Sequence, residues 1–174
     1  MKHLDGKNVL IFAEELYEDL ELWYPYYRLI EAGAGATIAA PEIKQYRGKN
    51  GYPLKPDTTF KEISADQFDI LIIPGGFAPD KLRRYKEVLQ ITRDFHEAKK
   101  VIAFICHAGW VPISAKILNG KNVTCVPAIK DDIENAGAIY HDKEVVVDEN
   151  IITSRRPPDL PAFCRAIIEH FSAG

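Results

Sequence analysis

The chain has 174 residues, 47% of them hydrophobic and 27% charged, which is typical of one globular domain with a single core. Its formal net charge of -3 and the lack of any Lys/Arg stripe exclude a basic nucleic-acid-binding surface. The apolar runs are too short to span a bilayer, and the N-terminus lacks the apolar segment of a secretory signal. We therefore expect a cytoplasmic protein without membrane partners.

The first half of the chain alternates short β-branched runs with segments of helical period, which predicts βαβ units and a parallel sheet. Strands are predicted at 8–12, 36–40 and 70–73, with a helix after the first strand and another at 86–98. The first helix carries apolar residues on one face, namely Leu20, Trp23, Tyr24, Tyr27 and Ile30. Between residues 42 and 60 the apolar pattern fades and Gly and Pro accumulate, which indicates a hairpin beside the main sheet.

The second half continues the same alternation. A buried strand at 101–105 is followed at once by Cys106 and by a helix over 107–118, closed by the C-terminal signal Asn119-Gly120. The remaining predicted elements are a strand at 122–126, a helix at 131–136, strands at 145–147 and 151–153, and a last helix from Asp159. Together they predict one doubly wound, three-layer α/β domain spanning residues 1–174.

Cys106 is the main candidate for a catalytic residue. Ligands bind at the carboxyl ends of strands in an open α/β sheet, and Cys106 lies at such an end in the sequence AFICHAG. A strand-turn-helix junction lifts a nucleophile out of the sheet, and the helix N-terminus should lower the thiol pKa. The alternative is a buried structural cysteine, the interpretation that we favour for Cys125 and Cys164. Three widely spaced cysteines fit neither disulfides nor a metal site, and no metal or cofactor is expected.

His107 and the Pro-Gly-Gly turn after residue 73 could complete such a site. The His107 imidazole could act as general base and acid if the turn brings it to the thiol; the alternative is a polar residue that covers a helix start. The N–H groups of Gly76 and His107 could form an oxyanion hole, with Gly75 lining the pocket. Pro-Gly-Gly by itself is also an ordinary turn.

An acidic run follows the first strand and comprises Glu14, Glu15, Glu18, Asp19 and Glu21. Its simplest interpretation is a solvated, charged helix start. A carboxyl close to Cys106 would instead be desolvated and partly protonated, and it would donate a hydrogen bond to the thiolate. Position alone does not single out one of the five.

Five separated segments carry a family resemblance: ELYEDLELWYP, LIIPGGFAPDKLR, FICHAG, PAIKDDIENAGA and VVVDENIITSRRPPDLPAF. In order and spacing they resemble the PfpI-like intracellular protease and protein deglycase family, of the class I glutamine amidotransferase-like superfamily. The resemblance implies a flavodoxin-like fold with a mostly parallel sheet, with Cys106 as nucleophile, His107 as catalytic histidine and Glu18 as the acid touching the thiol. It also implies an acidic partner of His107 from a neighbouring subunit. That acid maps onto Asp80, so a homo-oligomer is expected, either a dimer or a dimer-based hexamer.

Three positions depart from the family pattern. Asp80 stands where many members carry glutamate, and it could instead cap the helix that begins after it. Trp110 stands where glutamine is common, so it could narrow or rim the pocket. Val126 replaces a tyrosine of the archetypal protease, whose hydroxyl is absent here. True glutamine amidotransferases carry a His-x-Glu pair downstream of the cysteine, but His141 and His170 lack that glutamate, so this activity is not expected.

These residues predict a cysteine-dependent hydrolase in which Cys106 attacks a carbonyl. The substrate is either a peptide bond or a small α-oxoaldehyde or its glycated adduct on protein, and the site residues do not separate the two. The alternative function is non-enzymatic: a stress-response sensor or chaperone-like protein in which Glu18 holds an oxidised Cys106.

Overall fold

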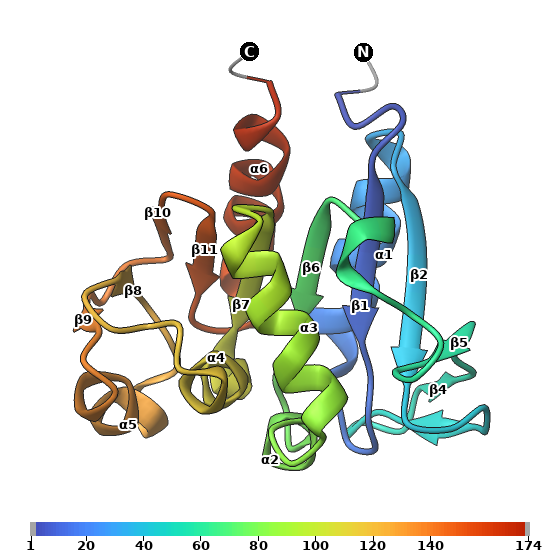
Figure 1. The fold of residues 1–174 in the computed structure, drawn as a ribbon, viewed down its shortest axis with the longest axis horizontal. Coiled ribbons are helices and arrows are strands. Elements are labelled where there is room, and N and C mark those ends of the chain that lie inside the picture. The colour runs from blue at the N-terminus through green and yellow to red at the C-terminus, as the bar shows by residue number, and fades with distance from the viewer. Residues whose placement is uncertain (1–2, 173–174) are drawn as a thin grey trace.

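Seven strands form the central sheet of the computed structural model, which describes residues 3–172 (Figure 1). Their order across the sheet is β10-β11-β7-β6-β1-β2-β5, and every neighbouring pair is parallel except β10 and β11. The strands are β1 (Asn8–Phe12), β2 (Gly35–Ala40), β5 (Thr58–Thr59), β6 (Ile70–Ile73), β7 (Val101–Ile105), β10 (Val145–Asp148) and β11 (Ile151–Ser154).

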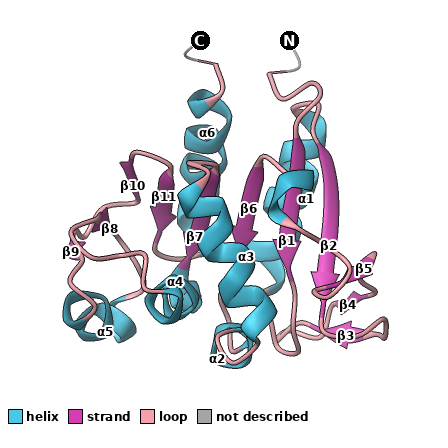
Figure 2. Ribbon diagram, in the orientation of Figure 1, coloured by secondary structure: helices cyan, strands magenta, loops and turns pink. Residues whose placement is uncertain are grey.

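Helices cover both faces of this sheet (Figure 2). They are α1 (Asp19–Glu31), α2 (Ala78–Leu82), α3 (Lys86–Glu97), α4 (Trp110–Ala115), α5 (Lys130–Asn135) and α6 (Leu160–His170). Helices α1 and α6 pack against each other on one face, whereas α3 packs with α4 on the other. The crossovers from β1 to β2 and from β6 to β7 run in opposite directions across the sheet, which places their helices on opposite faces. The predicted doubly wound, flavodoxin-like α/β fold is confirmed.

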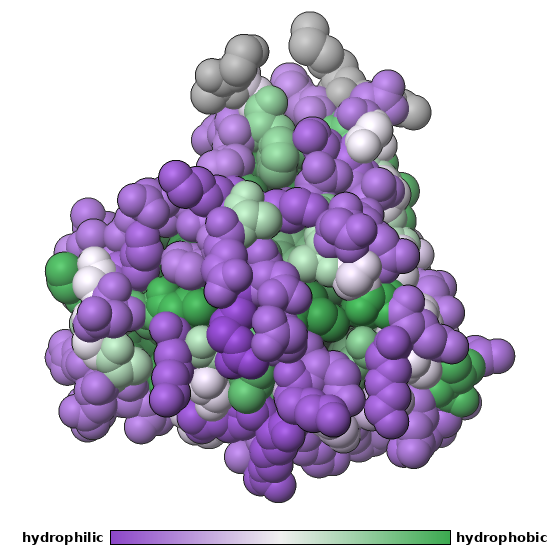
Figure 3. All heavy atoms as spheres, viewed as in Figure 1, coloured by the Kyte–Doolittle hydropathy of each residue, from purple (hydrophilic) through white to green (hydrophobic). Residues whose placement is uncertain are grey.

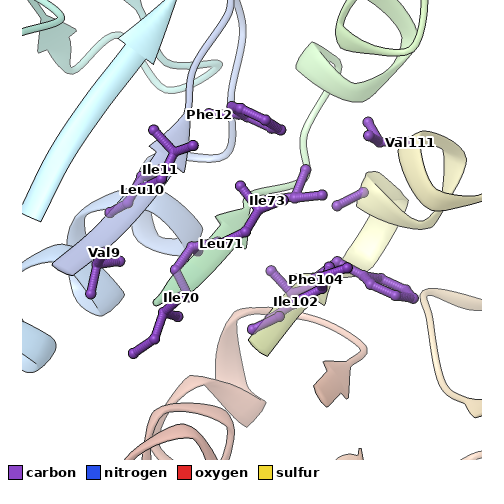
Figure 4. Close-up of a cluster of buried hydrophobic side chains, with 14 of the residues drawn as sticks. Val9, Leu10, Ile11, Phe12, Ile70, Leu71, Ile73, Ile102, Phe104 and Val111 are labelled. Carbon is purple, nitrogen blue, oxygen red and sulfur yellow. The ribbon is translucent and has the colours of Figure 1, made fainter. Parts of the chain in front are cut away.

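The centre of the core is the set of neighbouring strands β1, β6 and β7 (Figure 4). All residues of β6 and β7 are buried, because helices cover parallel strands on both sides. The register pairs Ile11 with Ile72 and Ile73 with Phe104, so these three strands end side by side. The loops that follow them therefore meet at one edge of the sheet.

Smaller elements lie beside the main sheet. The predicted hairpin is present as antiparallel β3 (Tyr46–Arg47) and β4 (Pro53–Leu54). The strand predicted at 122–126 is shorter in the structure, where β8 covers only Asn122–Val123 and pairs with β9 (Ile139–Tyr140). It ends there because the next N–H, that of Thr124, donates to the side-chain oxygen of Thr153.

The helix predicted over 107–118 is shorter than expected. A 3-10 turn occupies Cys106–Gly109, and α4 ends at Ala115, where Lys116 takes a left-handed φ of 61°. The Asn-Gly pair that seemed to close the helix belongs to the following connection, in which Gly120 N–H donates to the carbonyl of Gly137.

The apolar stripe of α1 largely faces outward, although its period is helical. Leu20 and Tyr27 are more than half exposed, whereas the buried side of the helix includes Glu21, Leu22 and Leu29. On the opposite face, in front of α3, hydrophilic residues cover most of the surface (Figure 3). Among residues 3–172, no helix has both the length and the apolar character needed to cross a membrane.

Candidate active site

Cys106 lies where β7 ends, between β6 and β11, and it begins the 3-10 turn. Its φ of 63° is a left-handed conformation that costs a residue with a side chain about 1–3 kcal/mol. Such a sharp strand-to-helix turn is how α/β enzymes lift a nucleophile out of the sheet. Cys106 is partly exposed, whereas Cys125 and Cys164 are fully buried in the core.

The His107 ring lies against the thiol, with Nδ1 3.3 Å from the Cys106 Sγ. Consecutive side chains diverge in an ideal α-helix, but the tighter turn and the positive φ of Cys106 bring these two together. Burial, and after it the charge of Lys49, lowers the pKa of His107. At neutral pH the imidazole is therefore uncharged, and Nδ1 can accept the thiol proton in the Nε2–H tautomer.

Two backbone donors converge on the sulfur. The backbone N–H groups of Gly76 and His107 lie close enough to Cys106 that both act to lower the thiol pKa. Gly76 has a φ of 80°, and a side chain there would collide with the backbone of the loop after β1. A methyl group on Gly75 would lie 2.5 Å from Glu21 Oε2 and 2.7 Å from the Cys106 Cβ. Both glycines are required by close approach, and the role of the Gly76 and His107 N–H groups as an oxyanion hole stays a prediction.

The carboxyl next to Cys106 belongs to Glu21, and the two groups shift each other's pKa, so the expectation that Glu18 touches the thiol is wrong. Glu21 has no exposed surface, and its Oε2 accepts the Gly75 N–H at 2.7 Å. Glu18 is the N-cap of α1, and its side chain accepts the Leu20 N–H. Asp19 and Glu21 are both buried in the first turn of α1, but only Glu21 Oε2 lies against Gly75, which also touches the Cys106 Cβ.

Burial sets the protonation of this acid-thiol pair. It raises the pKa of Glu21 to about 8, so the carboxyl keeps its proton at neutral pH. It also raises the pKa of Cys106 to about 12, with repulsion from a Glu21 carboxylate as the next cause. The expected lowering of the thiol pKa by a helix N-terminus is therefore outweighed. Repulsion requires two anions, however, and a protonated Glu21 can instead donate a hydrogen bond to the sulfur.

Lys49 brings a positive charge to the site, and sequence reasoning missed it. It lies in the loop of the β3–β4 hairpin, with Nζ 2.5 Å from Glu18 Oε2. Its charge interacts favourably with Cys106 and Glu21 when they are ionised, and it lowers the pKa of His107. A lysine in a Gly-rich turn is normally a solvated residue, so no sequence signal marks it.

The interpretation of the acidic run as a solvated helix start is wrong for four of its members. Glu14, Glu18, Asp19 and Glu21 are all less than 9% exposed. Glu14 accepts the Tyr85 hydroxyl at 2.7 Å, and Asp19 accepts two N–H groups of the hairpin loop, each at 2.9 Å. The Glu14 and Asp19 carboxylates are buried with hydrogen-bond donors that replace water, whereas Glu21 Oε1 has no such donor among residues 3–172. Asp19 thereby anchors the hairpin that carries Lys49.

Asp80 lies inside the first turn of α2, whose N-cap is Phe77, so the alternative role of Asp80 as a cap is wrong. Its carboxyl is half exposed and pairs with Arg84. Its contact with His107 across a subunit interface stays a prediction. Trp110 does lie beside the site, with its ring centroid 5.4 Å from that of His107.

Comparison with known proteins places this geometry in a family. The model of the DJ-1/PfpI family matches residues 7–170. Deglycase PfpI of Pyrococcus furiosus is 42% identical over 162 residues, 93% of this chain and 98% of that protein. General stress protein 18 of Bacillus subtilis is 39% identical over 163 residues, 92% of this chain and 95% of that protein. A two-domain protein of Anabaena variabilis with DJ-1/ThiJ/PfpI-like and ferritin-like domains superimposes with a TM-score of 0.94 at 38% identity, covering 96% of this chain and 48% of that one. The chain belongs to the DJ-1/PfpI family.

Proposed function

We propose that this protein is a thiol-dependent hydrolase of small carbonyl compounds, a deglycase or glyoxalase-type enzyme with Cys106 as its nucleophile. Its substrates are α-oxoaldehydes or the early adducts that they form on proteins. The observation that carries the proposal is the Cys106 Sγ itself, 3.3 Å from the His107 Nδ1 and close to two backbone N–H groups that act to lower its pKa. A relative that is 42% identical has the name deglycase, which supports this reaction class.

In the first step, the Cys106 sulfur adds to the carbonyl carbon of the substrate. The thiol proton moves to Nδ1 of His107, and the carbonyl electron pair moves onto oxygen. The N–H groups of Gly76 and His107 stabilise this oxyanion, a contribution typically worth about 3 kcal/mol for each donor. Return of the proton from the imidazole to the oxygen gives a neutral hemithioacetal. Glu21 keeps its own proton and stabilises the sulfur as charge develops on it.

The walls of the site favour a small substrate over a folded peptide. The thiol is partly buried, and the His107 and Trp110 rings pack against each other beside it. The Lys49–Glu18 ion pair lies on the side of the hairpin. A carbonyl of a few atoms, or one carried on a flexible side chain, can reach the sulfur past these groups. A peptide bond within a structured segment cannot, so we place peptidase activity second.

We also propose that the site is completed by a second copy of the chain. Within residues 3–172, the His107 imidazole has one hydrogen-bonding contact, that with Cys106. A general base needs a partner that fixes its tautomer. Asp80 of a neighbouring copy supplies that acceptor in our proposal, because its carboxyl is half exposed on α2 and its ion pair with Arg84 is a solvated one. The functional unit is then a homo-oligomer, a dimer or an assembly of dimers.

The test is a substrate panel of methylglyoxal, a methylglyoxal-treated peptide and the same peptide unmodified. We expect turnover of the first two, none with Cys106→Ala, and unchanged turnover with Cys125→Ala, which removes a thiol fully buried away from the site. Cleavage of the unmodified peptide alone would favour the peptidase. No turnover of any substrate, together with ready oxidation of Cys106, would favour the oxidation sensor.

A further inference from the structure

His107 is held by packing. Its only hydrogen-bonding contact within residues 3–172 is the thiol that it serves. The neighbour that restrains the ring is Trp110, with ring centroids 5.4 Å apart and planes inclined by 57°. This separation lies within the range in which tilted aromatic rings attract each other. The 3-10 turn explains the pairing, because side chains three residues apart in such a turn lie one above the other.

Trp110 is itself fixed on two sides by residues of other helices. Its Nε1 donates to Asp132 Oδ2 of α5 at 2.8 Å. The guanidinium carbon of Arg83, which follows α2, lies 5.6 Å from the indole centroid, within cation–π range. Arg83 is held in turn by its Nε, which donates to Ser114 Oγ at 2.9 Å, one turn further along α4. The indole therefore has little freedom to rotate.

These contacts form one chain from α2 and α5 to the reactive sulfur. We propose that Trp110 is a positioning residue, which holds the His107 imidazole with Nδ1 toward the Cys106 thiol and shields it from water. The proposal rests on the role of His107 in the proposed function. Trp110 acts through His107 and is not required to touch the substrate. Loss of the indole would let the imidazole rotate and become solvated.

Fluorescence gives a readout of this contact that requires no substrate. The chain has two tryptophans, so Trp23→Phe leaves Trp110 as the single indole. A protonated imidazole quenches an adjacent indole, whereas a neutral one does not quench it as strongly. In Trp23→Phe we expect the emission to fall with decreasing pH, with a midpoint below the ordinary histidine value of about 6.5, because burial lowers the pKa of His107. The added change His107→Gln should abolish this titration.

The rate at which iodoacetamide alkylates Cys106, measured against pH, tests the positioning itself. We expect Trp110→Ala to slow alkylation several-fold at pH 7 and to raise the inflection due to His107 toward about 6.5, because the ring becomes solvated. Trp110→Phe keeps a ring but loses the hydrogen bond to Asp132, so its rate should be intermediate. Asp132→Asn keeps an acceptor oxygen and should resemble wild type, as should the matched control Asp131→Ala.

Two results would overturn the positioning role. One is a fluorescence titration that persists in Trp23→Phe/His107→Gln, since the indole would then be sensing another group. The other is a Trp110→Ala variant, folded by circular dichroism, whose alkylation rate and inflection match those of wild type. Neither measurement uses a substrate, so inactivity toward every carbonyl compound would refute the proposed function and leave this inference standing.

Discussion

The replacement Glu21→Gln tests the proton that the structure places on a buried carboxyl. The pKa of Glu21 is raised from 4.5 to about 8 in the folded protein. Between these values the folded chain keeps a proton that the unfolded chain has lost. The contribution of this proton to the stability of the folded state is therefore complete below about pH 4.5, and it is lost as the pH rises toward 8. Glutamine has nearly the same shape and no ionisable proton, so the variant lacks this dependence.

The size of the effect follows from the separation of the two pKa values. They differ by about 3.5 units, 8 less 4.5, and each unit corresponds to about 1.4 kcal/mol. The proton on Glu21 then contributes about 5 kcal/mol to the free energy of unfolding at low pH, and about 4 kcal/mol of this contribution is lost between pH 5 and pH 8. This is a large share of the 5–15 kcal/mol that usually separates a folded domain from its unfolded state. Because Glu21 has no exposed surface, solvent screening does not reduce it.

Urea unfolding of wild type and Glu21→Gln at half-unit steps from pH 5 to pH 8 measures this difference. The stability of wild type should fall relative to the variant by about 4 kcal/mol over that range. Glu18→Gln is the matched control: it removes the neighbouring carboxylate at the helix cap, whose charge raises the pKa of Glu21 less than burial does, so it should keep most of the decline seen in wild type. A difference between wild type and Glu21→Gln that stays constant within about 1 kcal/mol would show that Glu21 ionises near its ordinary pKa, and the neutral-donor role would be wrong.

Three further outcomes follow from the site. Brief iodoacetamide treatment should label Cys106 ahead of Cys125 and Cys164, because only Cys106 is exposed, and peptide mapping that found either other thiol labelled first would contradict this. Gly75→Ala should abolish turnover and cost about 1–3 kcal/mol in urea unfolding, since its methyl group would overlap the Cys106 Cβ; a fully active variant would refute this close packing. Inactive Cys106→Ala chains mixed with inactive Asp80→Ala chains should regain some activity, because a mixed interface holds one intact site; a mixture that stays inactive despite subunit exchange would exclude the shared site.

The sequence was sufficient to locate the central strands and the nucleophile. Strands β1, β6 and β7 were predicted with their observed boundaries, because parallel strands covered on both faces consist of continuous apolar residues. Cys106 follows from the same pattern, as the polar residue directly after such a run. The pairing of Cys106 with His107 was predicted as a possibility, and it depends on a positive φ that no residue type in the turn demands.

The sequence was not sufficient where a polar residue is buried. Periodicity assigns the apolar side of α1 to the core, but the buried side of this helix carries Asp19 and Glu21. Their burial depends on donors far away in the chain, the N–H groups of Gly75 and of the hairpin loop. Because no local pattern encodes those partners, Glu18 and Glu21 look alike in the sequence although only one of them meets the thiol.

The first turn of α1 thus divides its acids between two tasks. Asp19 binds the backbone of the β3–β4 hairpin, and Glu18 binds the lysine that this hairpin carries, so both hold a positive charge near the site. Glu21 lies on the buried side of the helix next to Cys106, and its Oε1 has no hydrogen-bond partner among residues 3–172. The charge of Lys49 opposes protonation of His107, while the burial of Glu21 opposes its ionisation. In the proposed function, the hairpin and the helix therefore act together to keep a neutral proton acceptor and a neutral proton donor next to the same thiol, the state from which it would add to a carbonyl.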